Sequence, residues 1–225
     1  MTFSLVARCA ASGHFGVAVT SSSPAVAARC AFVRAGTGAV ASQNVTDPRL
    51  GPRVLDTMAS GQGAAAAVGQ VTDTADNTGW RQLLAVDVQG GTAIFSGDHA
   101  LGISAEGQAQ DAASAGNLLA NPGVPAAVLA GFASSSGHLG DRLMAALFAG
   151  LDAGGEAGPP HSARMLIAGE QSWPLVDLRC DWSEACPIRA LDAAWQVYRP
   201  QMDDYVIRAL DPAASPSYGV AGDDR

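Results

Sequence analysis

Residues 2–20 read TFSLVARCAASGHFGVAVT, and this stretch determines the type of fold that we expect. Small or polar residues alternate with apolar ones over residues 2–9, the pattern breaks at Ala11-Ser12-Gly13, and an apolar run covers residues 15–20. Alternation interrupted by glycine is typical of two antiparallel strands joined by a turn. The chain is therefore expected to begin with a β-hairpin.

The remaining elements are predicted in separate groups of strands and helices. Gln89-Gly90-Gly91 marks the turn of a second hairpin. Further strands are expected at residues 38–42, 83–88, 92–96, 102–108, 164–168 and 175–181. Helices are expected at residues 52–58, 64–71, 124–133, 139–151 and 187–210, the last with an interruption at Pro200. Because helices and strands do not strictly alternate, the order predicts a layered α+β domain and not a doubly wound dinucleotide fold.

The length of 225 residues suits one domain, and we find no repeat of fixed period and no low-complexity linker. We expect a single domain over residues 1–210 and an irregular tail over residues 211–225. The C-terminal helix, with Trp195, Val197 and Tyr198, offers a contact face for a homo-oligomer. The alternative is that this helix covers a sheet of its own subunit.

Charge and composition exclude several classes of function. The formal net charge is -8, which argues against a nucleic-acid partner. No window of 18 apolar residues and no secretion signal is present, so we expect a cytoplasmic protein without a membrane partner. All 13 basic residues are arginine, which excludes Schiff-base chemistry, a Walker lysine and a catalytic lysine.

The cysteines and histidines do not indicate a metal or a cofactor. Four cysteines occur without a CxxC pair, and we expect them to be buried, reduced thiols. The four histidines show no metal-ligand spacing. Residues 36–41, GTGAVA, imitate a dinucleotide fingerprint, but these glycines open a strand and a polar loop follows where the phosphate-binding helix should begin. We therefore expect neither a metal nor an organic cofactor.

Thr2 is the candidate nucleophile because it follows Met1 directly. Methionine is generally removed when the next side chain is as small as threonine, and removal would leave a hydroxyl and an α-amine on one residue. An α-amine has a reference pKa of about 7.7 to 8.0, so near neutral pH it can accept the hydroxyl proton. An N-terminal threonine is one recognised way to activate a weak hydroxyl nucleophile. Threonine at the second position is nevertheless common, so this residue alone does not identify an enzyme.

Several longer segments carry a resemblance to a known family. They are TFSLVAR at 2–8, GVAVTSS at 16–22, GTGAVASQN at 36–44, TDPRLGPRVLD at 46–56, WRQLLAVD at 80–87, AGNLLANPGV at 115–124, LGDRLMAALFAGLDAGGEAG at 139–158 and LVDLRCDWSEACPIRAL at 175–191. In these segments the chain resembles the bacterial family "domain of unknown function 1028". The resemblance implies an N-terminal nucleophile hydrolase fold, a four-layer α/β/β/α sandwich of two antiparallel sheets between helices.

The resemblance also shows where this chain departs from its relatives. Related proteasome-like hydrolases carry an aspartate on the second strand and a lysine on the third, whereas this chain has Thr20-Ser21 and residues 39–41, AVA, in those regions. The α-amine, or a water held by Ser21 or Ser22, must then serve as the base. Pro160-His161-Ser162 replaces the family's Arg-Gly-Gln-Ser pattern, which predicts a changed specificity if that loop contacts substrate.

An acyl-transfer site also needs hydrogen-bond donors for the developing oxyanion. Gln43, Asn44 and Asn117 are the candidates, and Gly116 precedes Asn117 where backbone amides can converge. The alternative is that these residues only make hydrogen bonds within loops. Two arginines, Arg81 and Arg29, are candidates for binding a substrate carboxylate, or else for structural ion pairs.

The sequence thus predicts an amidohydrolase that cleaves a small amide or peptide-like bond. Thr2, Ser21, Asn44 and Asn117 are the predicted catalytic residues. Gln43, Arg81 and Gly116 are the residues predicted to bind the small-molecule substrate. The alternative is a non-catalytic protein of the same fold that retains Met1 and either binds a small ligand or assembles as an oligomer.

Overall fold

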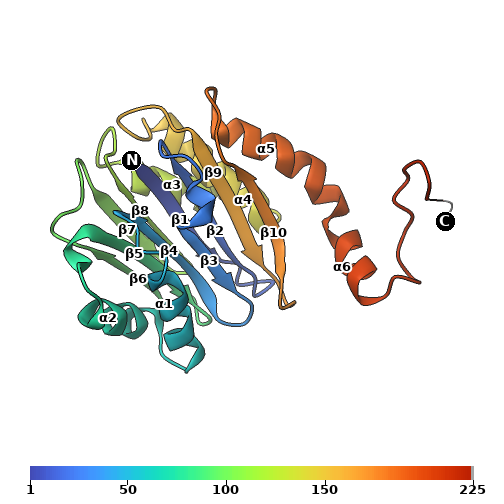
Figure 1. Ribbon diagram of the computed structural model, residues 1–225, viewed down its shortest axis with the longest axis horizontal. Helices are drawn as coiled ribbons and strands as arrows, with labels where there is room; N and C mark the ends of the chain where they lie inside the picture. Colours follow the sequence, from blue (N-terminus) through green and yellow to red (C-terminus); the bar gives the residue numbers. More distant parts are fainter. Residues whose placement is uncertain (224–225) are drawn as a thin grey trace.

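The computed structural model of the chain describes residues 1–223, in which two antiparallel sheets lie face to face (Figure 1). The six-stranded sheet has the order β10-β9-β2-β1-β8-β7, and the four-stranded sheet has the order β3-β4-β5-β6. The strands are β1 (Thr2–Arg8), β2 (Phe15–Ser21), β3 (Ala31–Arg34), β4 (Gly38–Asn44), β5 (Arg81–Asp87), β6 (Thr92–Ser96), β7 (Ala105–Ala109), β8 (Ala112–Asn117), β9 (Ser162–Ala168) and β10 (Pro174–Cys180).

Helices cover both outer faces of this pair of sheets. They are α1 (Leu50–Ala59), α2 (Ala64–Thr74), α3 (Val124–Ser134), α4 (Leu139–Asp152), α5 (Pro187–Tyr198) and α6 (Met202–Leu210), with 3₁₀ turns at Val26–Ala28, Thr78–Trp80 and Arg199–Gln201. Helices α3, α4 and α5 pack on the six-stranded sheet, and α1 and α2 pack on the four-stranded sheet. The predicted four-layer α/β/β/α architecture is thereby confirmed.

The alternation of side chains along β1 explains the layers. Phe3, Leu5 and Ala7 belong to the core beneath the helices, whereas Val6 belongs to the core between the two sheets. Successive strand residues point to opposite faces of a sheet, so one seven-residue strand supplies both cores. Because β1 lies inside its sheet, between β2 and β8, it is enclosed on both faces and both edges.

Both predicted hairpins are confirmed, but two strands were not predicted. They are β3 and β8, and the strand expected at residues 102–108 begins only at Ala105. Residues 112–117 read AASAGN, whose small side chains have weak strand propensity, so β8 forms because it pairs with β1 and β7. The predicted interruption of the last helix is confirmed, since the turn Arg199–Gln201 separates α5 from α6. Proline disrupts helical hydrogen bonding there.

Two further expectations about side chains need correction. All four cysteines are free, but only Cys30 is buried, whereas Cys9, Cys180 and Cys186 are partly exposed. Trp195 was a candidate for an oligomer contact face, with coverage of the sheet of its own subunit as the alternative; it is fully buried, and its indole donates to Asp141 of α4. That part of α5 therefore covers the sheet of its own subunit.

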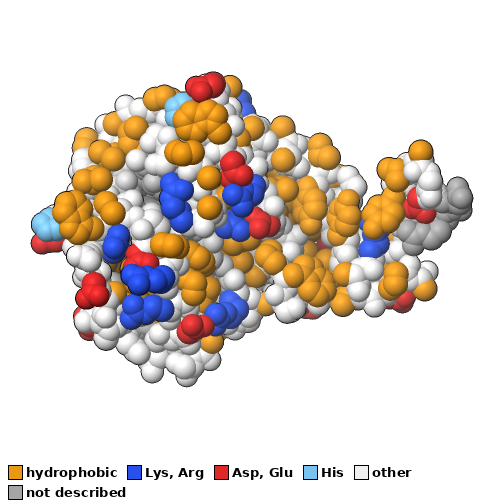
Figure 2. Space-filling model, viewed as in Figure 1, with side chains coloured by type: hydrophobic (Ala, Val, Ile, Leu, Met, Phe, Trp, Pro, Cys, Tyr) orange, Lys and Arg blue, Asp and Glu red, His pale blue; other side chains and the backbone are white. Residues whose placement is uncertain are grey.

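The end of the chain projects from the layered body (Figure 1). Residues 211–223 contain no helix or strand. Hydrophobic side chains lie along the part of the chain that projects, from the end of α5 through α6 to residue 223, in the space-filling view (Figure 2). The exposed ones include Val197, Ile207, Leu210 and Val220. The expected homo-oligomer stays a prediction. Within residues 1–223, no helix is both long enough and apolar enough to span a bilayer.

Candidate active site

The first residue of β1 lies between the last residues of its two neighbours. Thr2 pairs with Ser21 at the end of β2 and with Asn117 at the end of β8. Thr2 and Ser4 share a face of β1, and Ser4 donates to Gln43 of the other sheet at 2.6 Å. The Thr2 side chain therefore belongs to the layer between the sheets, at one end of the sandwich.

This inter-sheet layer changes from apolar to polar toward Thr2. The Gln43 amide nitrogen donates to Gln82 Oε1 at 2.7 Å and to the Ala115 carbonyl at 3.1 Å. Asn117 Nδ2 donates to the same Gln82 oxygen at 3.3 Å. Both glutamine side chains are fully buried, and buried amides need such partners. The two sheets are thus joined by side-chain hydrogen bonds directly behind Thr2.

Two hydroxyl groups converge on the carbonyl oxygen of Met1. Thr2 Oγ1 and Ser21 Oγ each donate to it at 2.6 Å, and the two hydroxyl oxygens lie 3.2 Å apart. The Ser23 amide donates to Ser21 Oγ at 3.1 Å, which orients that hydroxyl. With Met1 in place, Thr2 is only 6% exposed. The Ser21 hydroxyl thus donates to a carbonyl oxygen beside the candidate nucleophile, and such a donor is one of the parts that acyl transfer requires.

A buried carboxyl group, which the sequence did not indicate, completes this end of the molecule. Glu156 follows α4, forms a bridge with Leu119, and is 5% exposed. Its Oε2 accepts the Ser22 amide at 2.8 Å, and its Oε1 has no hydrogen-bond partner among residues 1–223. Burial raises the pKa of Glu156 to about 7, although the Ser22 hydrogen bond and the positive charges of the Met1 α-ammonium and of His161 lower it in part.

The raised pKa of Glu156 predicts how stability depends on pH. The folded protein holds the proton up to about pH 7, whereas the ordinary carboxyl value is 4.5. The folded state therefore binds more protons between these values, and this group makes the free energy of unfolding fall as pH rises from 4.5 to 7. Glu156→Gln removes the titratable carboxyl group and keeps an oxygen that can accept the Ser22 amide.

We therefore expect the thermal midpoint of Glu156→Gln to exceed that of the wild type by an amount that grows between pH 4.5 and pH 7. The difference should stay constant at higher pH. Thermal unfolding followed by circular dichroism at several pH values measures it. A difference that does not change with pH would contradict the assigned shift.

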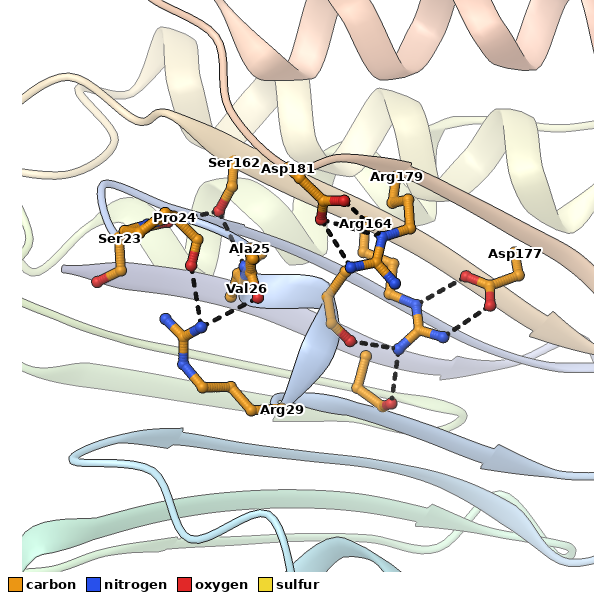
Figure 3. A network of polar contacts seen from close by, with 12 residues as sticks. Ser23, Pro24, Ala25, Val26, Arg29, Ser162, Arg164, Asp177, Arg179 and Asp181 are labelled. Atoms are coloured by element: carbon orange, nitrogen blue, oxygen red, sulfur yellow. Dashed lines mark hydrogen bonds and ion pairs between the residues drawn. The ribbon is translucent and has the colours of Figure 1, made fainter.

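A polar network holds the loop that supplies Ser22 and Ser23 (Figure 3). Ser162 Oγ donates to the Ser23 carbonyl at 2.6 Å, and Arg29 Nη1 donates to the Pro24 carbonyl at 2.9 Å. Arg164 Nη1 donates to the Ala27 carbonyl at 2.7 Å, and its guanidinium also pairs with Asp177 of β10. The wall of the Thr2 site is therefore attached to β9 and, through it, to the six-stranded sheet.

The remaining predicted site residues occupy several positions near this end of the sheets. Asn44 and Arg81 face each other at the ends of β4 and β5. The Asn44 amide donates to the Trp80 carbonyl at 2.7 Å and accepts the Leu101 amide at 3.2 Å, and Arg81 Nη1 donates to the Val45 carbonyl. The carbonyl of Gly116 accepts Gln82 Nε2 at 3.3 Å.

The structure thus brings Thr2, Ser21 and Asn117 together, with Gln43 joined to them through Gln82. The contacts described for Asn44, Arg81 and Arg29 are with backbone groups of neighbouring loops, and their roles stay predictions. Glu156 was missed, although one signal existed. The signal is that Glu156 is the only charged residue in the segment AGGEAGPP, residues 153–160, but a charged side chain in a loop is ordinarily solvated, so this does not predict its burial.

Comparison with known proteins identifies relatives of the chain. A model of a "Family of unknown function (DUF1028)" matches residues 2–191. A crystal structure of a protein of that family from Silicibacter pomeroyi is similar, with 30% sequence identity, a TM-score of 0.82 and coverage of 88% of each chain.

A further similar structure is Anbu, the ancestral beta-subunit from Yersinia bercovieri. It has 10% identity and a TM-score of 0.39, over 90% of this chain and 97% of that chain. None of the curated proteins compared with the chain matches it. The family match and the Silicibacter pomeroyi structure agree with the residues that carry the resemblance, and the chain belongs to the DUF1028 family of unknown function.

Proposed function

We propose that the protein is an amidohydrolase in which Thr2, freed of Met1, cleaves a small amide or peptide-like bond. The observation that carries this proposal is the convergence of the Thr2 and Ser21 hydroxyls on one carbonyl oxygen, 2.6 Å from each. Removal of Met1 frees both hydroxyls and creates the α-amine on the residue that bears the nucleophile. The four free cysteines fit a reducing, cytoplasmic location for this enzyme.

The chemistry proceeds in two steps that share one base. The Thr2 α-amine accepts the hydroxyl proton as Thr2 Oγ1 bonds to the substrate carbonyl carbon. The carbon–nitrogen bond then breaks, the proton passes to the leaving amine, and an ester on Thr2 remains. Water, deprotonated by the same amine, attacks the ester, releases the acid and restores the hydroxyl. Ser21 donates to the carbonyl oxygen as negative charge develops there, a contribution worth roughly 3 to 4 kcal/mol in comparable sites.

The hydrogen bonds to the Met1 carbonyl also support the alternative, a non-catalytic protein. While Met1 is present, its carbonyl occupies both hydroxyls and Thr2 has no free amine. A protein that keeps Met1 in the cell would therefore bind a small ligand or assemble without catalysis. The state of Met1 separates the two functions.

Two forms of the same sequence test the proposal. Expression with and without an inhibitor of methionine aminopeptidase supplies Met1-retaining and Met1-free protein, which intact mass distinguishes. On a panel of aminoacyl and acyl p-nitroanilides, the Met1-free form is expected to hydrolyse at least one substrate. The Met1-retaining form should be slower by about 10² to 10⁴, the usual contribution of a positioned base. Equal rates for both forms, or no hydrolysis by either, would contradict the mechanism.

A further inference from the structure

Met1 occupies the Thr2 site as an α-aminoacyl group would. Its carbonyl oxygen accepts hydrogen bonds from the hydroxyls of Thr2 and Ser21. Its side chain packs beside Gly158, where a Cβ added to the glycine would lie 2.8 Å from Met1 Cε. Its α-ammonium is close enough for its charge to lower the pKa of Glu156. The amine and hydroxyl of Thr2 are on adjacent carbons, so an acyl group joined to either one reaches overlapping space. The position of Met1 therefore outlines where the acyl part of a substrate would lie.

Glu156 is joined to the wall of that space through Ser22, the residue after Ser21, and carries an acceptor that is unused among residues 1–223. The residue is 5% exposed, Oε2 accepts from the Ser22 amide, and no group in the described part of the chain donates to Oε1. The nearby His161 is held elsewhere, because its Nδ1 lies 2.9 Å from the Ser183 carbonyl and its ring stacks on Trp182 with centroids 4.3 Å apart. Burying a carboxylate without a partner is costly, and an ionised carboxylate is satisfied by a cation that also donates hydrogen bonds.

We infer that Glu156 is a specificity-determining residue that binds an ammonium group on the carbon next to the scissile carbonyl, so that the substrates are α-aminoacyl amides. This inference rests on the proposed function and names its substrate class. Among the ion pairs of residues 1–223, none includes Glu156, so the Met1 α-ammonium does not itself pair with this carboxylate and Oε1 is left for an ammonium on an acyl group joined to the Thr2 hydroxyl. Gly158 provides the room beside the acyl side chain, and an unbranched side chain such as that of methionine fits it.

A matched pair of substrates tests the inference. Met1-free protein is assayed at pH 7, below the α-amine reference pKa of about 7.7 to 8.0, with L-methionine p-nitroanilide and with 4-(methylthio)butanoyl p-nitroanilide, which lacks only the ammonium. Glu156→Gln is expected to lower kcat/KM for the first substrate by about 10- to 100-fold, the range for one charged hydrogen bond, and to change the second less than about 3-fold. The control is Glu170→Gln, which removes the same charge from an exposed residue of the β9–β10 turn and should change neither.

The outcomes separate this inference from the proposed function. Equal losses on both substrates in Glu156→Gln would mean that the carboxylate acts on Thr2, which overturns the inference and leaves the hydrolase standing. If neither substrate is hydrolysed, the proposed function fails for α-aminoacyl amides. The ammonium site is then tested by calorimetric binding of L-methioninamide and 4-(methylthio)butanamide. Tighter binding of the first amide that is lost in Glu156→Gln supports the ammonium site. Equal binding of both amides, or no binding of either, overturns it.

Discussion

Thr2→Ala is expected to reduce kcat/KM for any amide that the Met1-free protein hydrolyses by roughly 10³-fold or more, because loss of the nucleophile removes the covalent route. Alanine is also small, so Met1 is still removed and the α-amine remains. In the Met1-free protein the substitution removes one hydroxyl that lies 3.2 Å from the Ser21 hydroxyl. Loss of one such hydrogen bond changes the free energy of unfolding by only about 1 kcal/mol. Steady-state kinetics and thermal unfolding of the same preparation measure the two effects.

Thr2→Ser is the matched control for this variant. Serine keeps the hydroxyl and the α-amine and loses only the γ-methyl group. We expect Thr2→Ser to keep measurable hydrolysis of the substrate on which Thr2→Ala is inactive. Wild-type activity in Thr2→Ala would show that another group is the nucleophile.

Phe3→Ala is expected to lower the free energy of unfolding by about 3 to 5 kcal/mol, the usual cost of truncating a buried phenylalanine. Phe3 is fully buried in the core between β1 and the helices, and its ring lies against the backbone of α4 at Gly150, where an added Cβ would be 2.7 Å from it. Because β1 is enclosed on all sides, neighbouring groups cannot close the cavity completely. Denaturant unfolding gives the change as a lower midpoint with an unchanged slope.

Val197→Ala provides the comparison for Phe3→Ala. Val197 lies on α5 and is 67% exposed, so its truncation should change the free energy of unfolding by less than about 0.5 kcal/mol. A loss below about 1 kcal/mol in Phe3→Ala would contradict the placement of β1 beneath the helices. The start of β1 positions Thr2, so this variant also tests the scaffold of the site.

Local patterns were sufficient for the two hairpins and for most helices. The turn at Ala11-Ser12-Gly13 and alternating side chains specify the pairing of β1 with β2, which places Ser21 opposite Thr2. The four-residue β3 pairs with β4 across the short turn at residues 35–37, whereas the small-residue β8 forms through pairing with β1, which is distant in sequence. No pattern within six residues predicts such pairing, because strand formation there depends on the neighbouring strands.

The candidate site likewise combines residues that local sequence patterns predict with residues that only long-range contacts bring into place. Thr2 and Ser21 follow from the chain start and the first hairpin, and the position of Asn117 beside Thr2 required the unpredicted β8. Glu156 reaches the site because its loop bridges Leu119 and accepts the Ser22 amide. These contacts join segments 37 and 134 residues apart, so composition alone could only single out a charged residue among glycines.

The most direct test of Thr2 as the nucleophile is the mass of the N-terminal tryptic peptide after the protein, purified from its own host, has reacted with a β-lactone. Arg8 ends this peptide, which reads TFSLVAR once Met1 is gone. A β-lactone acylates an activated hydroxyl and leaves its full mass on that residue. We predict a peptide that begins at Thr2 and carries the acyl group on the Thr2 side chain. A peptide that begins at Met1 and carries no acyl group would contradict the N-terminal nucleophile mechanism.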